Sequence, residues 1–254
     1  DADLRLSAAK LSARGLELGQ GGFTINAKNG KISNEVGALE LCGGEAEGRL
    51  DLDLSAPRSE ASLSGTLANV ALTNCLQSLG LNVPVKGSGT LDADISTGGT
   101  TREELIRGLA GTIKVSAAEG SLPVDLAALL AKSDAEASGW SQNAGTDYSA
   151  LDADCSISAG HLWCQSFHLV TDKGAITGAG GLDIAQQTLD WNFRMADPVA
   201  PADPPEPVSK SQPRITMNGT LSVPQIARTT HPAPQAGAST QETQVNRGPR
   251  VDSP

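Results

Sequence analysis

The sequence contains few aromatic residues: only 3% of its 254 residues are Phe, Trp or Tyr, although 39% are hydrophobic. A core built from this chain must therefore consist mainly of Leu, Val, Ile and Ala. Basic residues are fewer than acidic ones, and the net charge is −10. No basic stripe is available to neutralise phosphates, which argues against a nucleic-acid partner. We interpret the acidity as an Asp-rich, solvent-facing surface.

The sequence also lacks a signal peptide, an apolar run of membrane-spanning length and a Met at position 1. We therefore expect a fragment whose export signal or anchor lies upstream. Common catalytic signatures are missing as well, including Gly-x-Ser-x-Gly, His-Glu-x-x-His and the phosphate-binding loop. Only three His are present, so a His-based triad has few places to form. We expect neither enzymatic activity nor a bound cofactor or metal.

Apolar and polar residues alternate with period two in many short runs. Clear examples span residues 50–54, 91–95 and 151–157, where Leu or Ile alternates with Asp or Ser. Period two places alternate side chains on opposite faces of a strand, so each run has one apolar and one polar face. A series of such strands predicts a one-sided antiparallel sheet. Paired carboxylates such as Asp152 and Asp154 recur on the polar faces, which favours a solubilising role over acid–base catalysis.

Turn and helix signals divide the strands. Asn29-Gly30 is a hairpin signal, and Gly43-Gly44 separates two further strands. Three short helices are expected: one over residues 72–79, one after the capping box Thr101-Arg102-Glu103-Glu104, and one over residues 124–131. A polar loop is expected over residues 133–146. Later strands are expected at 148–158, 161–171, 174–184 and 188–195, with a last strand over 213–222. Residues 226–254 have no apolar period and are expected to be a disordered tail.

Four cysteines form an even count, as in exported proteins that oxidise such pairs. If Ala159-Gly160 is a two-residue turn, Cys155 and Cys164 lie directly opposite each other in a non-hydrogen-bonded pair. We therefore predict a disulfide between them, worth about 2–3 kcal/mol, with Ile157 and Leu162 as the neighbouring pair. Two buried free thiols are the alternative. Cys42 and Cys75 are left as a second pair only by elimination, and the sequence leaves their bonding open.

A zinc site at the same cysteines is not expected. By strand parity His161 points to the face opposite Cys164. His168 shares the Cys164 face but lies about 13 Å away along the strand. Tetrahedral ligation needs metal–ligand distances near 2.0–2.3 Å, which this spacing does not allow.

The order of several motifs resembles the C-terminal region of the AsmA family of bacterial envelope proteins. The resemblance covers roughly residues 1–225. A Leu-Asp-Ala-Asp-Ile strand precedes a capped helix, then an L-x-G-x-hydrophobic strand, a D-L-hydrophobic helix, a G-x-G-x-hydrophobic-D hairpin and a closing strand. The departure is Leu221-Ser222-Val223, where the family often has an aromatic residue. These motifs occupy residues 87–95, 109–115, 120–130, 178–191 and 213–224.

The resemblance implies an elongated periplasmic β-groove, anchored in the inner membrane by an N-terminal helix absent from this chain. It also implies a role in outer-membrane biogenesis and phospholipid traffic, with other envelope proteins as further partners. The expected fold is mainly β: a curved antiparallel sheet with about three short helices and a disordered tail. We expect groove strands over residues 1–83, the AsmA-like C-terminal region over 84–225 in the same sheet, and the tail over 226–254.

The function therefore depends on what the apolar face of the sheet contacts. Three short helices cannot cover all of it, so the sheet must fold over on itself or leave a groove that could shield phospholipid acyl chains. The alternative is a structural or adhesive β-sandwich or solenoid with a closed core and no ligand. Alternation predicts the residues that would line a groove. They are Leu50, Leu52, Leu54, Leu63, Leu67, Leu91, Ala93 and Ile95.

Overall fold

The computed structural model describes residues 1–8, 11–13, 16–78, 83–131, 136–141, 145–196 and 214–229. They form a single antiparallel sheet and three short helices. The helices are α1 (Leu72–Ser78), α2 (Arg102–Arg107) and α3 (Leu126–Ala131). The strands up to the middle of the chain are β1 (Ala2–Ala8), β2 (Leu11–Ala13), β3 (Leu16–Leu18), β4 (Gly21–Lys28), β5 (Lys31–Leu41), β6 (Gly44–Asp53), β7 (Ser59–Ala71), β8 (Lys86–Gly99) and β9 (Ala110–Leu122). The later strands are β10 (Glu136–Ser138), β11 (Thr146–Ser158), β12 (His161–Thr171), β13 (Gly174–Asp183), β14 (Thr188–Ala196), β15 (Arg214–Thr220) and β16 (Pro224–Thr229).

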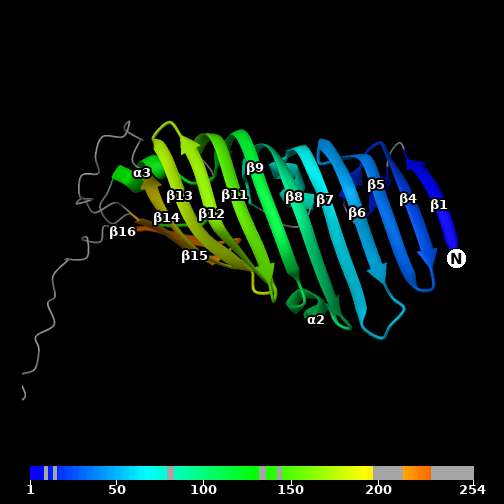
Figure 1. The fold of residues 1–254 in the computed structure, drawn as a ribbon. Helices are drawn as coiled ribbons and strands as arrows, with labels where there is room; N and C mark the ends of the chain where they lie inside the picture. The colour runs from blue at the N-terminus through cyan, green and yellow to red at the C-terminus, as the bar shows by residue number, and fades with distance from the viewer. Residues whose placement is uncertain are drawn as a thin grey trace, which may run out of the picture.

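Most strands pair with their neighbours in the sequence, so the sheet is a long meander (Figure 1). Its order runs from β1 and β4 through β9, then from β11 to β16. β10 departs from this order, because it pairs with β16 at the far edge of the sheet. The predicted strands 148–158, 161–171, 174–184 and 188–195 correspond to β11, β12, β13 and β14. The expectation of a mainly β, antiparallel, open curved sheet is confirmed.

Tight turns follow the sequence signals at two hairpins. Asn29 and Gly30 both have positive φ (50° and 77°), as a type I′ turn requires, and the flanking Lys28 and Lys31 pair. Ala159 and Gly160 make the same kind of turn, with φ of 51° and 78°. The turn expected at Gly43-Gly44 is instead formed by Cys42 and Gly43, because Leu41 already pairs with Gly44.

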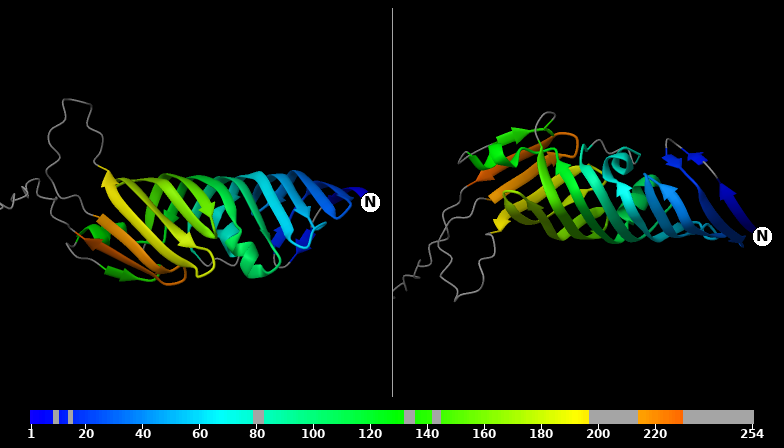
Figure 2. Two further views of the ribbon diagram at one scale, coloured as in Figure 1. Left: turned by 60° about the horizontal axis from the view of Figure 1, so that its bottom comes forward. Right: turned by 90° about the horizontal axis from the view of Figure 1, so that it is seen from above.

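The sheet curls at its C-terminal end and encloses a hydrophobic core. In the two views of Figure 2, β15, β16 and α3 fold back over the strands that precede them. The buried core residues come from α3 and from strands on both sides of the curl, which places the apolar face on its inside. They are Ala117, Leu126, Leu129, Tyr148, Leu151, Leu169, Ile176, Ile215 and Ile226.

The helices α1 and α2 lie on this same apolar face, near opposite ends of β8. A Cβ on Gly89 would lie 3.2 Å from the Leu72 side chain of α1, and Thr97 donates a hydrogen bond to the Leu105 carbonyl of α2. The predicted cap of α2 is confirmed: the Thr101 hydroxyl accepts from the Glu104 amide at 3.2 Å. Glu104 reaches back to the Thr100 amide at 2.8 Å, and these bonds lower the pKa of its carboxyl.

Two expectations about loops are wrong. The predicted polar loop before β11 contains β10, and residues 226–229 belong to β16 rather than to a disordered tail. Both segments are too short for an alternation of apolar and polar residues to be recognised in the sequence. β16 forms because it pairs with β15 and because Ile226 enters the core, only 3% exposed, and β10 forms because it pairs with β16. Residues 230–254, and Leu79 of the first predicted helix, lie outside the described residues.

Candidate functional site

Cross-strand pairing aligns the apolar side chains into three rows that cross the sheet. Directly paired residues of an antiparallel sheet project from the same face, so each chain of partners makes one continuous stripe. We name the rows after the β8 residues they contain. The Leu91 row is Leu39, Ala46, Leu67, Leu91, Val115, Ala153, Phe167, Gly178, Phe193 and Ile215. The Ala93 row is Leu6, Phe23, Val36, Gly48, Gly65, Ala93, Ile113, Cys155, Cys164, Gly180, Trp191, Met217 and Ile226. The Ile95 row is Leu4, Ile25, Asn34, Leu50, Leu63, Ile95, Gly111, Ile157, Leu162, Leu182, Leu189, Gly219 and Pro224.

The rows are longer than a lipid tail. The Ala93 row takes twelve steps from β1 to β16, and at about 4.8 Å per step its path measures about 58 Å along the sheet. The part from β1 to β9 alone measures about 29 Å. One leaflet of a bilayer has a hydrocarbon thickness of about 15 Å. The stripe can therefore lie along the whole length of an extended acyl chain.

Burial changes along the rows. Leu4, Leu6 and Leu63 are 49%, 50% and 45% exposed, although all three lie on the apolar face. At the curled end, Leu169 and Ile215 are only 1% and 3% exposed. The apolar face is thus closed over the C-terminal strands and partly open to solvent over the N-terminal ones, where Leu39, Ala46 and Val70 are nevertheless buried. We call the open part, from β1 to β9, the groove.

Strand pairing places seven of the eight residues predicted from the alternation on the groove face. Leu50, Leu63 and Ile95 belong to the Ile95 row, Leu67 and Leu91 to the Leu91 row, and Ala93 to its own row. Leu52 pairs with Ile32 and Ala61 at the next position along the strands. Leu54 follows β6 and is 53% exposed. The alternation in the sequence therefore places these seven residues on one face.

The opposite face carries polar and charged side chains. Thr66 donates a hydrogen bond to Asp92 at 2.6 Å, and Arg49 donates to Asp51 at 2.7 Å. At the strand ends Lys31 contacts Asp53 at 2.8 Å, and this contact, with bonds from Ser55, lowers the pKa of the Asp53 carboxyl. Asp152 and Asp154 are exposed on the same face. These interactions lie in water, and the groove face carries few polar side chains, among them Asn34 of the Ile95 row.

Both cysteine pairs form disulfides, Cys155–Cys164 and Cys42–Cys75. The predicted register is confirmed: Cys155 opposes Cys164 with a Cα–Cα distance of 3.8 Å, and Ile157 opposes Leu162. The second bond joins the β5–β6 turn to α1 and so fixes this helix at the groove edge.

The two histidines of the described strands do not approach one another. A bulge between Asp154 and Cys155 shifts the register of β12, so His168 pairs with Asp152 on the polar face. The expectation that His168 shares the Cys164 face is therefore wrong, because parity counting fails across a bulge. His161 lies beside Asp183 at 3.5 Å. Cys155 and Cys164 bind each other and are not free as metal ligands.

Sequence reasoning missed an apolar cavity at the curled end of the sheet. Phe167, Trp191 and Phe193 pack there, with Trp191 and Phe193 stacked at 5.4 Å between ring centroids and Phe167 edge-on to both. Trp140 lies on the same cavity. The sequence did contain a signal for an aromatic cluster here. Only 3% of its residues are aromatic, and most of these lie between positions 140 and 193.

Comparison with known proteins gives one match that covers most of the chain. The AsmA family model matches residues 1–167. The chain belongs to the AsmA family. The match extends over the groove strands and ends within β12, so the resembling motifs at residues 178–191 and 213–224 lie beyond it. No curated protein and no solved structure matches the chain significantly.

AsmA membership and the open sheet fit an envelope-associated protein. Among the described residues, no helix has both the length and the apolar character needed to cross a membrane.

Proposed function

We propose that this AsmA-family chain shields phospholipid acyl chains in its groove and transfers them between the inner and outer membranes from the periplasm. A membrane anchor preceding this chain and other envelope proteins are part of the proposal. The chain acts by binding and catalyses no reaction. The observation that carries it is the half-exposure of Leu63, in the middle of a strand and of the apolar face, while paired neighbours continue the apolar row on both sides.

The energetics support this role. An exposed apolar face is costly in water, and each methylene group buried against it contributes about 0.8 kcal/mol. Ten methylene contacts would therefore stabilise a bound tail by about 8 kcal/mol before the cost of ordering it. The headgroup would remain at the groove edge, where water and the polar ends of the strands lie. This arrangement is what transport of a lipid across an aqueous compartment needs.

The test places a charge in the groove. Leu63→Asp puts a carboxylate where an acyl chain would run, and a buried unpaired charge is costly. Because Leu63 is 45% exposed, the variant should still fold. Protein purified from a bacterial envelope should carry phospholipid in native mass spectrometry, and Leu63→Asp should lose it. Leu52→Asp and Leu91→Asp, at less exposed positions, extend the test along the groove.

A matched control uses the neighbouring residue. Ser64 is exposed on the polar face of the same strand, so Ser64→Asp adds the same charge outside the groove. It should retain the full lipid load. A folded Leu63→Asp variant that retains its lipid would refute the groove proposal. If Leu63→Asp unfolds while Ser64→Asp does not, the face is a closed packing surface, as in a structural β-sandwich.

A further inference from the structure

Two walls line the cavity at the curled end, which is half open to solvent. One wall is the rolled sheet from β12 to β16, including Phe167, Trp191 and Phe193, and the other is the segment from Leu122 to Leu126 with Trp140. Its volume is about 160 Å³. We call it the end cavity.

The end cavity continues the groove. The Leu91 row passes from Leu91 and Val115 through Ala153 to Phe167, Phe193 and Ile215. The Ala93 row reaches Trp191, Met217 and Ile226 in the same way. All six of these terminal residues line the cavity. The apolar face is therefore continuous from the groove to the cavity.

The residues that line the end cavity determine what kind of group it can bind. Every lining residue is apolar, and the indole N–H of Trp140 is already donated to the Leu221 carbonyl at 2.8 Å. A water molecule needs two to four polar partners, so this cavity does not suit water. An apolar cavity of about 150 Å³ is known to stay dry and to accept benzene, which corresponds to about six carbon atoms. The occupant is therefore a short apolar group.

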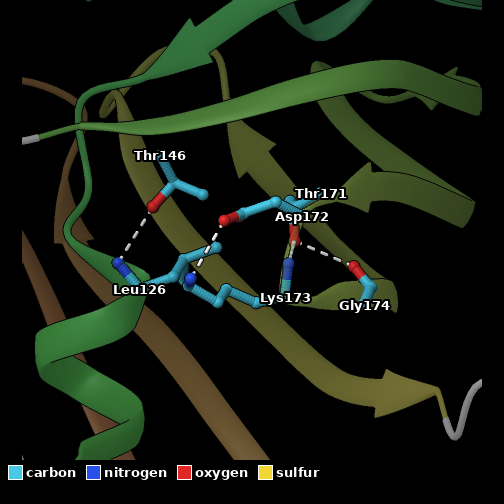
Figure 3. Close-up of polar contacts among 6 residues, drawn as sticks. All are labelled: Leu126, Thr146, Thr171, Asp172, Lys173 and Gly174. Atoms are coloured by element: carbon cyan, nitrogen blue, oxygen red, sulfur yellow. Dashed lines mark hydrogen bonds and ion pairs between the residues drawn. The ribbon is translucent and has the colours of Figure 1, made fainter.

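The second wall is held rigidly in place. Thr146 of β11 accepts a hydrogen bond from the Leu126 amide at 3.0 Å and donates one to the Val124 carbonyl at 2.7 Å. Figure 3 shows the first of these bonds at the start of α3, together with the Thr171–Gly174 contact that closes the β12–β13 turn. Thr146 is buried, so both bonds are protected from water. The cavity is therefore a built feature of the fold.

We propose that the end cavity binds the methyl-terminal segment of an acyl chain whose remainder lies in the groove. The segment is about six carbons long. It inserts between the aromatic cluster and the Val124 wall, so the carboxyl or headgroup end points toward the N-terminal strands. This inference rests on the proposed function, because it assigns the orientation of the lipid in that groove.

The three tryptophans provide the assay, since Trp140 and Trp191 line the cavity whereas Trp163 lies outside it. Trp163 is 48% exposed on the polar face, next to Gly181. Bromine quenches tryptophan fluorescence on contact. Two probes are used: fatty acids brominated near the methyl end and fatty acids brominated near the carboxyl end. In Trp163→Phe, the methyl-end probe should remove most of the emission and the carboxyl-end probe little. In the Trp140→Phe/Trp191→Phe variant, neither probe should quench Trp163 strongly.

A filled cavity should abolish the effect. Val124→Phe places a ring in a space that accepts one, so methyl-end quenching should be lost while the fatty acid still binds the groove. Val223→Phe is the matched control, because Val223 is 51% exposed and does not line the cavity. It should quench like its parent. Val85→Phe fills the cavity from another segment of its lining and replaces Val124→Phe if that variant does not fold.

The outcomes separate the two proposals. If phospholipid binds but the carboxyl-end probe quenches as well as the methyl-end probe, the cavity assignment is overturned and the groove proposal survives. If no phospholipid is carried but the methyl-end probe quenches and Val124→Phe stops it, the cavity stands and the transport proposal fails. Absence of quenching by either probe overturns the cavity assignment, whatever the phospholipid result.

Discussion

Leucine-to-alanine substitutions on one sheet face should have very different costs, depending on whether other parts of the chain cover the substituted side chain. Leu169 on β12 is 1% exposed and belongs to the core, whereas Leu63 on β7 is 45% exposed in the groove. Both side chains project from the apolar face of the same sheet. We expect Leu169→Ala to lower stability strongly, and Leu63→Ala to lower lipid binding with little effect on stability.

The magnitudes follow from burial. Truncation of a fully buried Leu removes the transfer free energy and leaves a cavity, so Leu169→Ala should cost about 3–5 kcal/mol. Full burial of a Leu side chain contributes about 1.5–3 kcal/mol, and Leu63 is only partly buried beside open space. Leu63→Ala leaves no enclosed cavity and should cost about 1 kcal/mol or less. The two variants should thus differ by at least about 2 kcal/mol.

Urea unfolding followed by far-ultraviolet circular dichroism measures the difference. The midpoint should fall sharply in Leu169→Ala and slightly in Leu63→Ala, with the slope against urea unchanged in both. The measurement is made on lipid-free protein, because bound lipid would add its own stabilisation. Equal costs at the two positions would refute the reasoning, since they would mean that Leu63 is packed against something in the lipid-free chain.

Three further predictions concern charge, crosslinks and the C-terminus. Because its lysine partner lowers the pKa of Asp53 below its ordinary value, that ion pair stabilises the fold above about pH 4 and loses its effect as the pH falls further. The melting temperature of Asp53→Asn should therefore approach that of the parent protein at acidic pH, and parallel curves would contradict this. Replacing both Cys42 and Cys75 by Ser should lower the free energy of unfolding by about 4 kcal/mol, against about 2.5 kcal/mol for removal of the Cys155–Cys164 disulfide. The reason is that the first disulfide closes a loop of 33 residues and the second a loop of 9. Denaturant unfolding of the oxidised and reduced proteins tests which disulfide contributes more. Deleting residues 230–254 should leave the melting temperature unchanged, whereas deleting from position 224 removes Ile226 from the core and should lower it by several degrees.

The sequence was informative wherever local pattern determines structure. Period-two alternation placed the strands and their apolar faces, and the Ala159-Gly160 turn fixed the Cys155–Cys164 register. Register counting then failed beyond Asp154, because the bulge adds one residue to β12 and reverses the faces. No local pattern marks such a bulge. His168 was misplaced for this reason alone.

The closed end could not be predicted, because it depends on contacts between distant segments. β10 and β16 are too short to show a period; β16 is ordered by pairing with β15, and β10 by pairing with β16. Likewise, nothing near Val124 indicates that it will face Phe193 across a cavity. Alternation tells which side of a strand is apolar, but the curvature of the sheet decides whether that side is covered.

The meandering strand order has a consequence for how this chain acquires its structure. Most strands can pair with the strand made just before them, so short loops suffice and the sheet can grow in one direction from an early hairpin. The β10–β16 pair is different, because β10 must wait unpaired until the last described strand has emerged. In synthesis from the N-terminus, the open sheet would therefore form first and its closure last. A chain that ends before position 224 should have a folded open sheet whose C-terminal core is exposed to solvent and to proteolysis.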